Sequence, residues 1–311
     1  MPRILVTPRS LTAKRHPALQ PLADAGFEIV TCTPGATPGT EELIRLLPGC
    51  VGWLAGVEPV AESVIEAADV LRAISRNGTG VDNLPLDLLA RRGIRVLKAE
   101  GANASGVAEL AIGLILAGLR HIPFTDAGLK AGGWPRRQGS EIRHRTVGII
   151  GCGAIGYEVA RLAVALGASV LGHDIVRRSL PLAHFRWAGL EAVLREADII
   201  SLHAPALAGG VPLLDAAALA RARPGLVLVN TARASLVDEA AVLAGLEDGR
   251  IVAYATDVFA EEPPRSLDLV RHPRVIATSH IGGFTAESVQ RATEVAVDNL
   301  LAAIAAPVLA G

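Results

Sequence analysis

Three short stretches of the sequence contain residues suited to acid–base or anion-binding chemistry. They are VNTARASLVDE, ATDVFAEEPP and TSHIGG, which supply Arg233, Glu262 and His280 and lie where predicted strands end. Hydride transfer to or from a carbon that bears an oxygen needs a group that gives or takes a proton at that oxygen, and histidine has a suitable ordinary pKa. A neighbouring carboxylate stabilises the imidazolium, and arginine binds a carboxylate bidentately. Together the three residues indicate oxidoreductase chemistry on a hydroxy or keto acid.

Each of these residues also has a structural interpretation. Arg233 alone would more often form a surface ion pair, and Glu262 stands beside Glu261 in an acidic, solvated loop. His280, at a strand end, fits a structural or a chemical role about equally. The combination carries the hypothesis. The remaining histidines, which lack such neighbours, are expected to be structural or exposed: His16, His121, His144, His173, His184, His203 and His272.

A glycine-rich turn predicts a dinucleotide site. VGIIGCGAIG (147–156) places Gly151, Gly153 and Gly156 between a predicted strand and a predicted helix. The first glycine permits the tight turn, the second lets the backbone approach a pyrophosphate, and the third lets the helix pack on the strand. Backbone N–H groups at the helix start would bind the anion. The alternative, incidental glycines at a helix start, is disfavoured by the matching strand and helix on either side.

An acidic residue follows this turn at the spacing expected for a ribose contact. Asp174 ends the next predicted strand, ASVLGHD, eighteen residues after Gly156. A carboxylate here binds the adenosine ribose hydroxyls and repels a 2′-phosphate, so the sequence favours NAD over NADP. Arg177 and Arg178 follow closely and could weaken this preference.

Strand-like and helix-like segments alternate along the chain. Five strand-like runs occupy the first hundred residues, a helix is predicted over 104–122, and a second alternating series begins at RTVGII. The alternation predicts an α/β protein with two doubly wound parallel-sheet domains. No strand follows the last predicted helix (285–306), so we expect that helix to pack on the first domain and make it discontinuous.

The composition narrows the function classes. Thirty basic residues balance thirty-one acidic ones without a charged block, which argues against nucleic-acid or membrane-surface partners. The N-terminus lacks the apolar region of a signal peptide, so we expect a cytoplasmic protein. Three cysteines without paired spacing predict no disulfide framework and no metal site.

Six segments spread along the chain carry a family resemblance. They are SRNGTGVDNLPLDLLARRGIRVL, GANASGVAELAIGLIL, GCGAIG, NTARASLVDEAAVLAGLEDGRI, DVFAEEPP and HIGG. With them the chain resembles the D-isomer-specific 2-hydroxyacid dehydrogenases, and within these the 3-phosphoglycerate dehydrogenase branch.

The resemblance implies a Rossmann NAD-binding domain (101–284) inserted in a flavodoxin-like substrate-binding lid domain (1–100 and 285–311). It implies that Arg233, Glu262 and His280 are catalytic. The implied NAD contacts are Gly151, Gly153, Ala154, Ile155, Gly156, Asp174, Ala204, Thr231, Ala232, Asp257, Gly282 and Gly283. The implied substrate contacts are Arg76, Asn77, Gly78, Thr79, Gly80 and Asn103. The resemblance further implies closure of the SRNGTG loop over the nicotinamide, and a homodimer to which the apolar helix AELAIGLILAGL would contribute.

Several positions depart from the family pattern. Ser279 replaces the usual proline before the catalytic histidine, Ala234 replaces a glycine, and ALAGGVP replaces a threonine-containing loop. WLAGVEPV lacks the arginine with which some relatives bind a phosphate. The chain ends at Gly311, where longer relatives carry a regulatory extension, so no feedback by serine is expected.

The substrate remains open at this point. The branch puts 3-phosphoglycerate first, yet the missing cation predicts that it is accepted weakly and that an unphosphorylated short acid competes well. Glyoxylate, hydroxypyruvate or another sugar acid is the alternative. A different class, an NAD(H)-sensing corepressor-like binding protein, is disfavoured by the intact Arg–Glu–His set.

Overall fold

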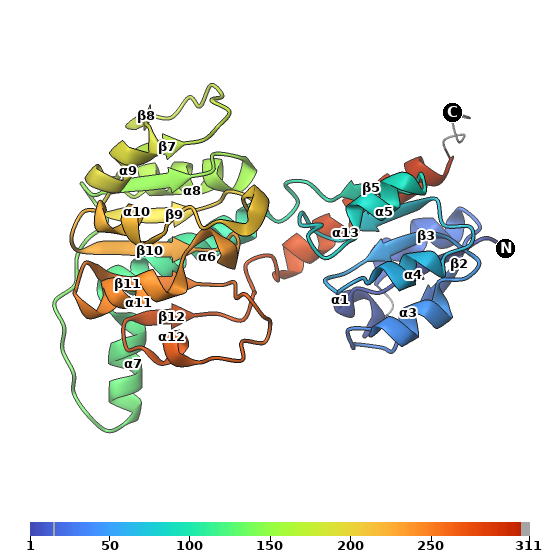
Figure 1. Ribbon diagram of the computed structural model, residues 1–311, viewed down its shortest axis with the longest axis horizontal. Coiled ribbons are helices and arrows are strands. Elements are labelled where there is room, and N and C mark those ends of the chain that lie inside the picture. Colours follow the sequence, from blue (N-terminus) through green and yellow to red (C-terminus); the bar gives the residue numbers. More distant parts are fainter. Residues whose placement is uncertain (15, 306–311) are drawn as a thin grey trace. The chain divides into compact units, whose positions relative to one another are not determined.

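The computed structural model describes residues 1–14 and 16–305, which divide into two compact α/β units (Figure 1). The first unit comprises residues 1–103 and the segment that begins at Thr285, and the second comprises Ala104–Phe284. Each unit has its own parallel sheet. The architecture expected from the alternating sequence pattern is thus confirmed. The part of the expected lid domain at 306–311 lies outside the described residues.

The sheet of the first unit has the flavodoxin-like strand order β2-β1-β3-β4-β5, with every pair parallel. Its strands are β1 (Arg3–Val6), β2 (Glu28–Thr31), β3 (Cys50–Ala55), β4 (Ala73–Arg76) and β5 (Arg95–Lys98). All five coincide with the apolar runs read from the sequence. Its helices are α1 (Arg9–Thr12), η1 (Pro17–Leu19), α2 (Gln20–Asp24), α3 (Thr40–Leu46), α4 (Glu62–Glu66), α5 (Leu86–Arg91) and α13 (Ala286–Ala305).

The last helix, α13, completes the core of the first unit. Its buried Val297 and Leu300 belong to one apolar cluster with Ile4 of β1. Asn299 Nδ2 also donates to Lys98 O at 3.0 Å. This packing returns the end of the described chain to the unit in which the chain began.

The sheet of the second unit has the order β12-β11-β10-β9-β6-β7-β8 and is parallel throughout. Its strands are β6 (Thr146–Ile150), β7 (Ser169–His173), β8 (Phe185–Trp187), β9 (Ile199–Leu202), β10 (Leu226–Asn230), β11 (Ile251–Thr256) and β12 (Val275–Ala277). The strand order reverses between β6 and β9, which is where dinucleotides bind in such sheets. The edge strand β8 was not predicted, because three residues give too short a pattern.

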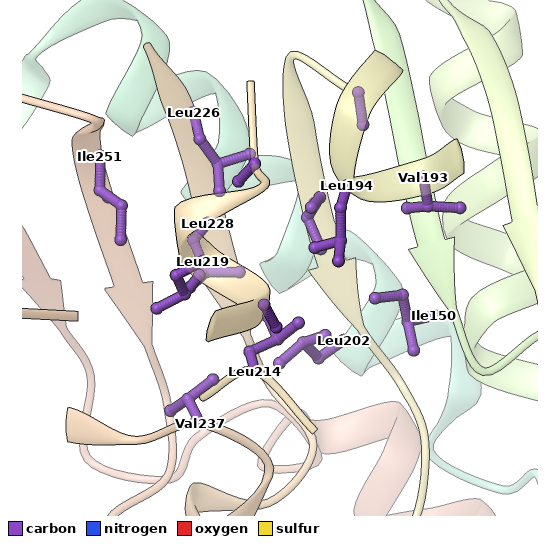
Figure 2. Packing of buried hydrophobic residues seen from close by; sticks show 14 of the residues in the cluster. Ile150, Val193, Leu194, Leu202, Leu214, Leu219, Leu226, Leu228, Val237 and Ile251 are labelled. Carbon is purple, nitrogen blue, oxygen red and sulfur yellow. The ribbon is translucent and has the colours of Figure 1, made fainter. Parts of the chain in front are cut away.

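Helices cover both faces of this second sheet. They are α6 (Ala104–Arg120), α7 (Ile122–Lys130), α8 (Ala154–Ala165), α9 (Leu190–Glu196), η2 (Ala208–Gly210), α10 (Ala216–Ala220), η3 (Ala234–Leu236), α11 (Glu239–Glu247) and α12 (Asp268–Arg271). On one face, Val193 and Leu194 of α9 and Leu219 of α10 pack against Leu202 and Leu228 of the sheet (Figure 2). On the other face, α6 and α8 cover strands β6, β9, β10 and β11.

The helix predicted over 104–122 is two helices in the structure. The first, α6, ends at Arg120; His121 has φ +53°, and α7 starts at Ile122 with Pro123 in its first turn. Proline is favoured there because its missing N–H would lack a helical partner anyway. After Lys130 the chain forms a loop that leads to β6. Within the described chain, no single helix is long and apolar enough to cross a bilayer; α6 and α7 would qualify only as a pair bent by 67°.

The expectation that the apolar helix AELAIGLILAGL contributes a dimer contact stays a prediction, but most of its apolar face is covered within its own unit. Ala111, Leu114 and Ile115 are buried against the sheet and α8 of their own unit. By contrast, no residue of α7 is buried, and Ile122 and Leu129 are half exposed there.

Candidate active site

Backbone packing at the β6–β9 switch point requires the glycines of the predicted dinucleotide turn. Gly151 has φ +89°, and a Cβ there would lie 2.5 Å from Ala204 N, on the segment that follows β9. A Cβ on Gly156 would overlap the carbonyl oxygen of Gly151 and lie 3.0 Å from its carbonyl carbon. These two glycines therefore allow α8 to start directly against the end of β6.

The second glycine of the turn, Gly153, leaves space for a ligand. Gly153 is the N-cap of α8 without a side-chain capping bond, and a Cβ on it would meet no described atom within 4 Å. The N–H groups of Ala154 and Ile155 in the first helical turn are left for an external acceptor. An open groove of about 330 Å³ adjoins them and includes Tyr157 and Arg178 in its lining. This cradle fits the diphosphate of a dinucleotide.

Asp174 lies beside this turn, directly after β7. Its Oδ2 accepts from Cys152 N at 2.7 Å, and its Oδ1 accepts from Val176 N at 2.9 Å. The carboxylate thus fixes the glycine turn in addition to the ribose role predicted for it.

The segment after β10 contains Thr231, Ala232 and Arg233 and is held by Asn230, for which no role was predicted. Asn230 is fully buried; its Oδ1 accepts from Ala232 N at 3.1 Å and its Nδ2 donates to Arg233 O at 2.8 Å. The sequence did offer one signal for this role: Asn230 is a polar residue at the end of the apolar run LVLVN. Thr231 Oγ1 is buried without a partner among the described residues, as expected of a group that awaits a ligand.

His280 and Glu262 form a pair between the loops that follow β12 and β11. His280 Nδ1 lies 2.8 Å from Glu262 Oε2 and 3.0 Å from Oε1. Their side chains are 50% and 39% exposed. The bond to Nδ1 leaves Nε2 of the imidazole for a substrate.

The pair shifts both pKa values toward the charged forms. The hydrogen bond that His280 donates to Glu262 raises the pKa of His280 above its ordinary 6.5; burial and the charge of Arg233 oppose this, and the charges of Glu262 and Asp257 support it. Burial alone would raise the pKa of Glu262, but the bond and charge of His280, the Phe259 N–H and Arg233 lower it below 4.5. An ionised pair with a cation nearby suits a group that exchanges protons at neutral pH.

Arg233 lies near enough to act on both members of the pair. It follows β10 immediately before η3, and its Nη1 donates to Ala232 O at 2.7 Å. Its charge contributes to the shifted pKa values of Glu262 and His280. The three predicted catalytic residues therefore gather at the carboxyl ends of β10, β11 and β12.

Asp257 anchors the loop that carries His280. It is almost fully buried after β11, and its two oxygens accept from Thr278 Oγ1, Ile281 N and Gly282 N. A Cβ on Gly282 would lie 3.0 Å from Asp257 Oδ2, which explains the glycine. Gly283 follows in the same loop.

His203 belongs to the same edge, although the sequence suggested nothing beyond a structural or exposed histidine. Its Nε2 lies 2.8 Å from Ser201 Oγ, and its Nδ1 is buried without a partner in the described part of the chain. Burial lowers the pKa of His203 to about 3, so this imidazole is neutral at physiological pH.

The predicted substrate residues lie in the first unit, in the segment after β4 and just before α6. Asn77 N donates to Ala55 O at 2.9 Å, Arg76 Nη1 donates to Asn77 O at 3.0 Å, and Gly78 has φ +152°. Thr79 and Gly80 continue the same loop. The side-chain oxygens of Asn77 and Asn103 are buried without partners among the described residues. Such amides are suited to a polar ligand.

Comparison with known proteins matches this arrangement to one family. Residues 112–282, more than half of the chain, match the model for the D-isomer specific 2-hydroxyacid dehydrogenase, NAD binding domain. The chain belongs to the D-isomer specific 2-hydroxyacid dehydrogenase family. Its second unit is the NAD-binding Rossmann domain, and NAD is the cofactor.

Relatives within the family have several activities. The chain is 36% identical to D-3-phosphoglycerate dehydrogenase of Rattus norvegicus over 88% of its own length and 52% of that protein, so it spans about half the length of this relative. It is 36% identical to hydroxypyruvate reductase of Thermotoga maritima over 81% of the chain and 84% of the relative. A glyoxylate reductase structure from Paecilomyes thermophila superposes with a TM-score of 0.87 at 25% identity, covering 98% of this chain and 95% of the other.

Proposed function

We propose that this protein is an NAD-dependent dehydrogenase that interconverts a small D-2-hydroxy acid and its 2-keto acid. The observation that carries the proposal is the His280–Glu262 pair, 2.8 Å apart, with Arg233 beside it at the dinucleotide-binding edge of the sheet. A proton-exchanging group and a carboxylate-binding group next to a nicotinamide cofactor are what this reaction requires.

In the oxidation direction, His280 acts as the base. Its Nε2 takes the proton of the substrate hydroxyl. NAD, held at the glycine turn, would supply the hydride acceptor when bound. Glu262 stabilises the imidazolium that forms at His280. In the reduction direction the imidazolium returns the proton to the carbonyl oxygen, so the hydroxyl is restored.

Arg233 holds the substrate carboxylate. A guanidinium can donate two parallel hydrogen bonds to a carboxylate, which fixes the orientation of the neighbouring carbon. In the first unit, we assign further substrate contacts to Arg76, to the backbone of Gly78, Thr79 and Gly80, and to Asn77 and Asn103.

We propose an unphosphorylated substrate, of the glyoxylate, hydroxypyruvate or glycerate type. The loop after β3 bears a buried carboxylate instead of a cation: Glu58 Oε1 accepts from Gly56 N at 2.9 Å and from the Thr7 hydroxyl. A Cβ on Gly56 would lie 2.5 Å from Glu58 Oε2 and 3.1 Å from Pro8 Cα, so a larger side chain at this position would require the loop to shift. The similarity to hydroxypyruvate reductase over most of both chains also favours this alternative over 3-phosphoglycerate.

Two steady-state titrations test the substrate class. D-glycerate and D-3-phosphoglycerate are varied separately at fixed NAD, and NADH formation is followed by absorbance, with His280→Ala as the control for turnover by this site. We expect the larger kcat/KM for D-glycerate. A value for the phosphorylated acid a hundredfold above that for D-glycerate would refute the unphosphorylated assignment, and no turnover of any short D-2-hydroxy acid would refute the function.

We also propose a two-fold symmetric homodimer, the commonest closed arrangement of identical chains. Because the apolar face of α6 is covered within its own unit, the surface we propose is α7 and the loop after it. This surface exposes Ile122, Leu129 and Trp134, with Trp134 81% exposed.

A further inference from the structure

The loop that carries His280 is held at three points by one carboxylate. Asp257 Oδ1 accepts from Thr278 Oγ1 at 2.6 Å and from Ile281 N at 2.8 Å, and its Oδ2 accepts from Gly282 N at 2.8 Å. Two of these bonds lie after His280 in the chain, and one lies before it. Asp257 therefore contacts the segment on both sides of the histidine.

His280 adopts a backbone conformation that needs such support. Its φ is +53°, in the left-handed region, which non-glycine residues occupy at a cost. Conformations of this kind persist when their surroundings fix them, and they concentrate at functional sites.

Thr278 connects the sheet to this loop. Its N–H donates to Thr256 O at 3.0 Å, which continues the pairing of β11 with β12 beyond Ala277, while its hydroxyl reaches Asp257. The hydroxyl thus forms the one contact of the three that lies on the N-terminal side of His280. Ser279, between them, leaves this backbone without the rigidity of a proline ring.

We propose that Thr278 is a positioning residue which, through Asp257, holds His280 in the left-handed conformation that brings its Nδ1 to Glu262. This proposal deepens the proposed function and depends on it for the role of His280. Asp257 then has a structural role within the protein, in addition to the cofactor contact that the family resemblance implies.

The expected consequence of losing the hydroxyl follows from the groups that face His280. Glu262 and Asp257 favour its imidazolium, and Arg233 opposes it. If the loop relaxes, the Nδ1–Glu262 hydrogen bond, which is the largest contribution, weakens while Arg233 stays in place. The pKa of His280 should therefore fall.

The test compares Thr278→Val, which keeps the shape and removes the hydroxyl, with Thr278→Ser, which keeps the hydroxyl. Histidine labelled with ¹³C at Cε1 is titrated by NMR in the cofactor-free protein, with the His280 signal assigned by its absence in His280→Ala. In Thr278→Val we expect a lower pKa for His280 and a kcat about tenfold lower, the effect of one hydrogen bond to a charged group. In Thr278→Ser both should stay near wild type. Thr278→Ala is the second variant if the valine protein does not fold.

The outcomes separate this proposal from the proposed function. A lower melting temperature in Thr278→Val with unchanged His280 titration and unchanged kcat would make Thr278 merely structural and overturn the proposal. Absence of dehydrogenase activity in the wild type would overturn the function, whereas the NMR titration would still decide whether Thr278 positions His280.

Discussion

Two glycines of the dinucleotide turn should differ in how much stability they lose on substitution by alanine. A Cβ on Gly156 would overlap Gly151 O and lie 3.1 Å from Ile149 Cγ2, so Gly156→Ala must push α8 away from β6. Overpacking of this kind costs about 1–3 kcal/mol. Since about 1 kcal/mol shifts the melting temperature of a domain this size by about 2–4 °C, we expect a decrease of about 2–12 °C. NAD binding should weaken as well, because the helix start moves.

Gly153→Ala is the matched control. Gly153 has φ −72°, which alanine adopts freely, and its Cβ would meet no described atom within 4 Å. Stability should therefore change little, by the small penalty for alanine at an N-cap. The added methyl instead occupies the space through which a pyrophosphate approaches the backbone, so the Kd for NADH should rise at least about tenfold, or about 1.4 kcal/mol.

Differential scanning calorimetry and isothermal titration with NADH measure the two effects separately. Gly156→Ala is expected to lose both stability and affinity, and Gly153→Ala affinity alone. If Gly153→Ala binds NADH as the wild type does, the cradle at the start of α8 is not the diphosphate site. If Gly156→Ala has the same melting temperature as the wild type, the steric reason given for this glycine is wrong.

Further predictions concern the acid–base pair, the cofactor and assembly. His280→Ala should lower kcat about 10²–10⁴-fold with little change in the NADH Kd measured by titration; unchanged turnover would contradict its role. Glu262→Gln should lower the pKa of His280, so the acidic limb of the kcat profile for oxidation, and the basic limb for reduction, should both move to lower pH; profiles that coincide with wild type would count against the pair. The stabilisation of the fold by this pair is expected to be complete between pH 4.5 and 6.5. It should decrease as the pH rises through the raised pKa of His280 or falls through the lowered pKa of Glu262. Because both side chains are partly exposed, it should amount to about 0–1 kcal/mol, which urea denaturation at several pH values can measure. NAD should give a much higher kcat/KM than NADP because of Asp174, and equal efficiency would exclude its ribose role. Light scattering should give twice the mass of one chain, and Leu129→Glu should reduce it to one; a wild-type monomer at micromolar concentration would exclude the dimer.

Secondary structure was predictable from the sequence wherever the types of neighbouring residues determine it. The five strands of the first unit and the glycine turn were predictable, because short apolar runs between turn residues and a strand–glycine–helix sequence carry their own signal. The helix break at His121 was missed although Pro123 marks it, and β8 was missed because three residues are too few to show a strand pattern. The dimer contact expected of the α6 segment stays a prediction, although most of its apolar face is covered within its own unit. An apolar stripe predicts burial but does not identify what covers it.

The sequence by itself determined the chemistry available to this protein: a dinucleotide turn, an acid eighteen residues later, and an arginine, a glutamate and a histidine after successive strands. Only the tertiary structure decided which of these groups meet. Glu262 and His280 come within 2.8 Å because β11 and β12 are parallel neighbours whose carboxyl ends share one edge, and the contact of Thr278 with Asp257 arises in the same way. Hydrogen bonds between residues distant in sequence depend on strand order and loop path. Strand order and loop path result from the packing of the whole unit, so they cannot be read from a short sequence pattern.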